Sequence, residues 1–127
     1  MRHLLLALLV ATSLPVHAAN DGPEGAIASV ARATGMSNQF SARCGADPDL
    51  LKRHKAQFES EANTANARLP AGRQVDIRAE FTVGADEADR YYDGVKDTQA
   101  RAMVCQAMEA QVTRALSGPG VLTIPVR

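Results

Sequence analysis

The two cysteines, Cys44 and Cys105, are the residues of this 127-residue chain whose chemistry is easiest to interpret. No other cysteine is present, so they allow one intramolecular disulfide, which an oxidising compartment favours. A redox-active pair is typically written Cys-x-x-Cys, whereas these two are 61 positions apart. The sequence therefore predicts a structural disulfide between Cys44 and Cys105.

His54 is the only histidine beyond the first 18 residues. It lies between Leu51 and Phe58 on an apolar helical stripe, a position typical of a half-buried histidine that is hydrogen-bonded to a neighbour. Any Ser-His-Asp or Cys-His group would have to use it, and no G-x-S-x-G or comparable nucleophile motif occurs. A metal site would need further ligands around it. We expect no catalytic residue, no metal and no cofactor.

An acidic run covers the third predicted helix and the residue that follows it. Its members are Asp86, Glu87, Asp89, Asp93 and Asp97. Their spacing suits a helix and not a calcium loop, which needs oxygen ligands at alternating positions. The first interpretation is a solvated face, partly neutralised by Arg90 and Arg101, and the second is a docking surface for a partner. The candidate partner-binding residues here are Asp86, Asp89, Tyr91, Tyr92 and Asp93.

The last ten residues form an apolar tail (residues 118–127) after the helix-breaking run Ser117-Gly-Pro-Gly. Residues 121–127 are short, apolar and rich in β-branched side chains, which predicts an extended conformation. The tail either lies across its own bundle or adds as a strand to the sheet of a partner. In the second case Val121, Leu122 and Ile124 are candidate partner-binding residues.

The first 18 residues have the pattern of an export signal, with a positive start, an apolar run and small residues before a cleavage site. We expect cleavage after Ala18, with Ala19 as the next choice. The apolar run is shorter than the ~20 residues that a membrane-spanning helix needs. The sequence thus predicts a periplasmic or secreted protein without a stable membrane anchor.

Removal of this leader leaves 109 residues, which is enough for one domain with one core. Only Arg2 is lost among the charged residues, so 13 basic and 14 acidic side chains remain, a net charge of −1. This balance argues against binding to nucleic acid or to an anionic membrane. A core rich in alanine and poor in aromatic residues benefits from a covalent cross-link.

Hydrophobic periodicity predicts helices along most of the mature chain. The first lies within residues 20–36, and Gly35 is the residue expected to stop it. Residues 37–45 add a further turn. The second covers 48–68, with the strongest start signal of the chain, Asp47-Pro-Asp. Two more follow over 77–95 and from Asp97 or Thr98 to Leu116.

The apolar stripes of these helices identify the candidate core. The second helix has Leu51, His54, Phe58, Ala62, Ala65 and Leu69 on one side. The last helix has Ala102, Cys105, Met108, Val112 and Leu116. In the third helix Gly84 and Ala88 allow a neighbouring helix to approach closely.

These patterns predict an all-α fold, namely a small antiparallel bundle of three longer helices and one or two short ones with one disulfide. The domains are a leader over 1–18, a helical domain over 19–117 and the tail over 118–127. We expect a non-enzymatic exported protein that binds a protein partner in the periplasm as an inhibitor, immunity protein or assembly helper. The alternative is a stress chaperone that exposes apolar helix faces, and an enzyme or small-ligand carrier would require a pocket with convergent polar groups. The oligomeric state is left open.

Overall fold

The computed structural model describes residues 22–118, in which four α-helices and one 3-10 helix are the regular elements. In chain order they are α2 (Gly22–Arg43), α3 (Pro48–Ala67), η1 (Ala71–Arg73), α4 (Ile77–Gly94) and α5 (Thr98–Ser117). No strand occurs within this range. The predicted all-α class is confirmed.

Two predicted features fall outside the described residues. The leader over residues 1–18 is one, and the other is the apolar part of the tail with Val121, Leu122 and Ile124.

Aspartate side chains set the starts of α3, α4 and α5. Asp47 accepts a hydrogen bond from the backbone N–H two residues further on, at 3.1 Å, and Pro48 occupies the first helical position. Asp97 accepts from the backbone N–H of Ala100 at 2.9 Å and caps α5, and Asp76 caps α4 in the same way. These contacts explain why three helices begin where they do, and the predicted start at Asp47 is confirmed.

The first helix is longer than predicted, because Gly35 does not end it. α2 continues through Gly35 to Arg43 and joins the predicted short helix to the turn that follows it. Gly35 is buried against α4, where a Cβ atom would lie 2.9 Å from the carbonyl carbon of Phe81. The helix ends instead near Gly45, whose φ of +87° is the left-handed conformation that favours glycine. The prediction that Gly35 is a stop is therefore wrong, since this glycine serves helix packing.

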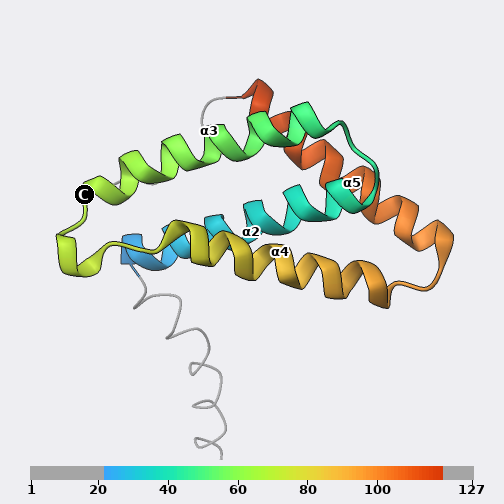
Figure 1. The fold of residues 1–127 in the computed structure, drawn as a ribbon, viewed down its shortest axis with the longest axis horizontal. Coiled ribbons are helices and arrows are strands. Elements are labelled where there is room, and N and C mark those ends of the chain that lie inside the picture. The colour runs from blue at the N-terminus through green and yellow to red at the C-terminus, as the bar shows by residue number, and fades with distance from the viewer. Residues whose placement is uncertain (1–21, 119–127) are drawn as a thin grey trace, which may run out of the picture.

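Consecutive helices reverse direction, as the short connections predict, so α2 and α4 run parallel to each other (Figure 1). These two form the most extensive interface of the bundle. Arg32 donates to Glu80 at 2.5 Å near the start of α4, and Arg43 donates to Asp93 at 2.5 Å near its end. The two ion pairs advance together along both helices, which is the signature of parallel packing.

The core lies between α2, α3 and α4. Its buried members are Ile27, Ala31, Phe58, Ala62, Ala65, Leu69, Ile77 and Phe81. The predicted stripe of the second helix is buried throughout, His54 included. By contrast α5 has one buried side chain, Val112, and Ala102 is exposed although its spacing predicts a core position. The last helix is therefore packed less deeply than the other three.

Candidate functional site

The acidic and aromatic residues predicted as a partner surface lie in the second half of α4, and part of this surface is used within the bundle. Asp89 accepts hydrogen bonds from Gln39 at 2.9 Å and from Arg43 at 3.0 Å, and Asp93 accepts from Arg43. The bonds from Gln39 and Arg43 lower the pKa of Asp89 below its ordinary value. Neutralisation of these acids thus comes from Arg43 of α2, and not from Arg90 and Arg101 as the sequence predicts.

The two tyrosines of α4 have different surroundings. Tyr92 is half-buried, with its ring centroid 5.3 Å from that of Phe40 and with the guanidinium carbons of Arg43 and Arg101 at 4.5 and 4.7 Å. Tyr91 contacts Phe40 at its inner edge and remains 47% exposed. Among the candidate residues of this helix, Asp86, Tyr91 and Asp93 are exposed, and Asp93 is paired with Arg43.

His54 is more deeply buried than the half-buried position that the apolar stripe predicts, and its side chain has a polar neighbour. The Nδ2 atom of Asn38 lies 3.0 Å from His54 Nδ1 and also donates to the carbonyl oxygen of Leu51. Because an amide NH2 group only donates, His54 Nδ1 accepts and the ring proton resides on Nε2. Burial lowers the pKa of His54 below its ordinary value of 6.5. His54 is therefore neutral in the folded protein at neutral pH.

Acidification is expected to lower the free energy of unfolding through His54. Since the pKa of His54 is lower in the folded chain, the unfolded chain binds the proton more readily. Stability should fall as the pH is lowered through about 6.5 and should stop falling, for this group, below the folded pKa. Urea unfolding of the wild type and of His54→Gln between about pH 7.5 and 5 measures this. Equal pH dependence in the two proteins would contradict the prediction.

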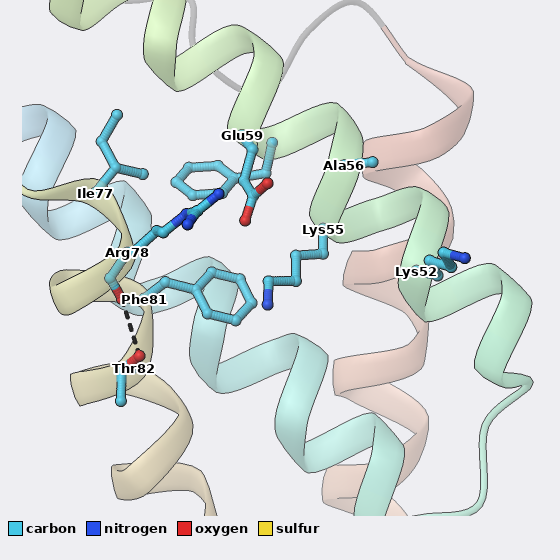
Figure 2. A pocket seen from close by; sticks show the side chains of 9 residues that line it. Lys52, Lys55, Ala56, Glu59, Ile77, Arg78, Phe81 and Thr82 are labelled. Atoms are coloured by element: carbon cyan, nitrogen blue, oxygen red, sulfur yellow. Dashed lines mark hydrogen bonds between the residues drawn. The ribbon is translucent and has the colours of Figure 1, made fainter.

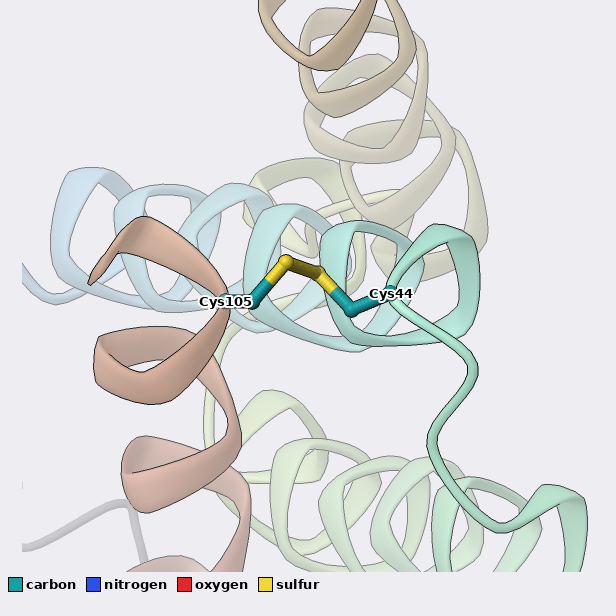
Figure 3. Close-up of a disulfide and its surroundings, with 2 residues drawn as sticks. All are labelled: Cys44 and Cys105. Atoms are coloured by element: carbon teal, nitrogen blue, oxygen red, sulfur yellow. A yellow bond between two sulfur atoms is a disulfide. The ribbon is translucent and has the colours of Figure 1, made fainter. Parts of the chain in front are cut away.

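The predicted disulfide between Cys44 and Cys105 is present and joins the end of α2 to the middle of α5 (Figure 3). The Cα atoms are 5.8 Å apart and both residues are partly exposed. Such a bond indicates an oxidising environment. Within residues 22–118, no helix is long and apolar enough to cross a membrane.

A groove of about 500 Å³ lies between α3 and α4, and its floor is apolar (Figure 2). Phe58 of α3 and Phe81 of α4 stack there with their ring centroids 6.0 Å apart, and Ile77 lies beside them. The groove exists because α3 and α4 both pack on α2 and make few contacts with each other. We refer to it below as the α3–α4 groove.

The rim of the α3–α4 groove is mainly basic. Lys52, Lys55 and Arg78 line it together with one acid, Glu59. The ammonium nitrogen of Lys55 lies 5.2 Å from the centroid of the Phe81 ring (Figure 2). One cation over an aromatic ring, with two more on the rim, forms a surface that complements an acidic segment with apolar side chains.

Sequence reasoning missed the α3–α4 groove. A partial signal existed, because Lys52, Lys55 and Glu59 recur at helical spacing along one side of the predicted stripe. That spacing alone is typical of any solvated helix face. Pairing these residues with Arg78 and Phe81 requires the packing of α4.

Within the described range, no group of histidine, cysteine, aspartate and glutamate side chains is arranged to hold a metal ion. Comparison of the chain with family models, with curated proteins and with solved structures gave no significant match.

Proposed function

We propose that this protein is an exported, non-enzymatic binding protein whose partner is another protein of the periplasm or cell exterior. Three observations support the proposal: a leader-like start of the sequence, a disulfide that indicates an oxidising environment, and an apolar groove with a charged rim. The proposed role is that of an inhibitor, immunity protein or assembly helper.

The α3–α4 groove is the observation that carries the proposal. Phe58 and Phe81 are core side chains that form an aromatic floor at the base of the groove, and Lys55 lies over the Phe81 ring. An amphipathic partner helix with apolar residues on one side and acidic residues along its edge matches this floor and rim. We propose that such a helix binds between α3 and α4.

The test compares two charge reversals on one helix. Lys55→Glu changes the rim of the groove, whereas Arg53→Glu makes the same change in net charge on an exposed residue of α3 that does not line it. Immobilised wild type and both variants are exposed to an extract of the oxidising compartment and cross-linked. The bound segment is then identified by mass spectrometry and synthesised as a peptide.

We expect the peptide to be acidic with apolar residues at helical spacing. Its affinity should fall about tenfold for Lys55→Glu, a change of about 1.4 kcal/mol, and should stay near the wild-type value for Arg53→Glu. Equal affinity for the two variants, or a cross-link outside α3 and α4, would exclude the groove as the binding site.

A stress chaperone is a second candidate, and buried His54 supports it, because protonation of the unfolded chain favours opening of the bundle in acid. Suppression of the aggregation of unrelated client proteins at about pH 5 but not at pH 7.5 would favour this function. A dedicated partner-binding protein should not suppress this aggregation at either pH.

A further inference from the structure

A second cavity, which we call the His54 cleft, lies where α2, α3 and α5 meet and has a volume of about 210 Å³. Val30 and Ala33 of α2 and Ala115 of α5 give it apolar walls, and His54 of α3 lines it as well. Val30 packs against the core and is only partly buried. The cleft is therefore an apolar surface that the described helices leave incompletely covered.

The polar groups of the His54 cleft differ in their hydrogen bonding. Thr34 and Ser37 donate their hydroxyl protons to carbonyl oxygens of their own helix, those of Val30 and Thr34. His54 is 4% exposed, and its Nδ1 accepts from Asn38. Among residues 22–118 its Nε2–H has no hydrogen-bond partner. An N–H group without a protein partner, on a residue that lines a cleft, favours an acceptor such as a backbone carbonyl oxygen.

The chain leaves α5 next to this cleft. Gln111 and Ala115 line the cleft, and α5 ends two residues after Ala115, at Ser117. Gly118 then has the extended backbone angles φ −103° and ψ 176°. The residues that follow, 119–127, can span up to about 30 Å at roughly 3.3 Å per residue. The tail is thus long enough to reach the cleft from the point where the described part ends.

The tail also has a suitable side-chain pattern. In an extended segment alternate side chains point to opposite sides. In the extended conformation that its sequence predicts, the tail would have Leu122, Ile124 and Val126 on one aliphatic side and Thr123 on the other. The aliphatic side matches the apolar walls of the cleft in chemistry.

We propose that the tail binds in the His54 cleft of its own chain, with Leu122, Ile124 and Val126 against the apolar walls and a tail carbonyl oxygen accepting from His54 Nε2–H. This binding covers Val30 and Ala33. It leaves the α3–α4 groove open, because α5 lies on the other flank of α3, where Gln57 donates to the carbonyl oxygen of Ala115. The inference is thus independent of the proposed partner site.

Nuclear magnetic resonance of the full chain tests the proposal, with His54 signals assigned by comparison with His54→Gln. In the wild type we expect nuclear Overhauser contacts between the methyl groups of Ile124 and the ring of His54, and slow exchange of the Nε2 proton. Leu122→Asp should remove these contacts and accelerate the exchange at least about tenfold, since burial of an unpaired carboxylate strongly disfavours binding. Thr123→Asp adds the same charge on the opposite side and should leave both signals near their wild-type values.

Unchanged amide signals of α4, which does not line the cleft, verify that the variants remain folded. A substitution on the cleft side, Ala33→Glu, gives an independent check, because Ala33 is exposed and the larger acid should displace the tail without unfolding the bundle. Equal His54 signals in Leu122→Asp and Thr123→Asp would overturn the proposal. Contacts found only between differently labelled molecules in a mixed sample, or contacts of the tail with Phe81, would overturn it as well.

Discussion

Reduction of the Cys44–Cys105 disulfide is expected to lower the free energy of unfolding by about 4 kcal/mol, because the bond closes a long loop in the unfolded chain. The two residues are 61 positions apart, so most of the bundle lies within that loop. A loss of this size is comparable with the whole stability of a small domain. Urea unfolding with and without reductant measures it.

After reduction, α5 should be the first helix to unfold locally. Val112 is the one side chain of this helix that is fully buried, whereas α2, α3 and α4 share the main core. Without the disulfide, α5 is held by few contacts, among them the bond from Gln57 to the Ala115 carbonyl and the placement of Arg101 over Tyr92. Hydrogen exchange should therefore show early loss of protection in α5, while α2 and α4 keep theirs.

The double variant Cys44→Ser with Cys105→Ser is the matched control. It should reproduce the stability of the reduced wild type and should not respond to reductant. A wild type whose unfolding midpoint is unchanged by complete reduction would contradict the prediction, and uniform loss of protection over all four helices would contradict the special weakness of α5.

Local signals in the sequence predicted most of the fold. The Asp47-Pro-Asp start, the choice of Asp97 or Thr98 as the cap of the last helix and the stripe that contains His54 each depend on residues within a few positions of one another. The disulfide was predictable for another reason, since two cysteines permit only one intramolecular pairing.

Features that depend on which helices meet were not predictable in this way. Arg43 neutralises Asp89 and Asp93 from α2, about fifty positions earlier in the chain, although Arg90 is far closer in sequence. The floor of the α3–α4 groove likewise combines Phe58 and Phe81 of two helices. Periodicity identifies the inward side of each helix but not the neighbour that it contacts.

Gly35 was mispredicted because a glycine in a helical pattern is compatible with two different structures, the end of a helix or a close contact between two helices. A glycine within a helical pattern commonly marks the end of the helix. In this chain Gly35 instead faces α4, and Gly84 of α4 faces α2 in return, so the two backbones approach directly. Local sequence around Gly35 does not distinguish these cases, whereas the small-residue pair Gly84 and Ala88 predicted close approach correctly.

Gly84→Ala is expected to lower the free energy of unfolding by about 3 kcal/mol, at the upper end of the usual effect of overpacking. A Cβ atom at position 84 would lie 2.7 Å from the carbonyl carbon and 2.9 Å from the Cα atom of Arg32. Both are backbone atoms of α2, so no side-chain rotation relieves the contact. The helices must separate instead, at the most extensive interface of the bundle.

Gly94→Ala is the matched control, because the residue belongs to the same helix and a Cβ atom there meets no other atom within 4 Å. This substitution should be neutral or should raise the free energy of unfolding by about 0.5 kcal/mol, since alanine has less freedom in the unfolded chain. Urea unfolding of both variants separates helix propensity from packing, because propensity alone favours alanine at both positions. If Gly84→Ala were as stable as Gly94→Ala, α2 and α4 would not be in backbone contact at this crossing.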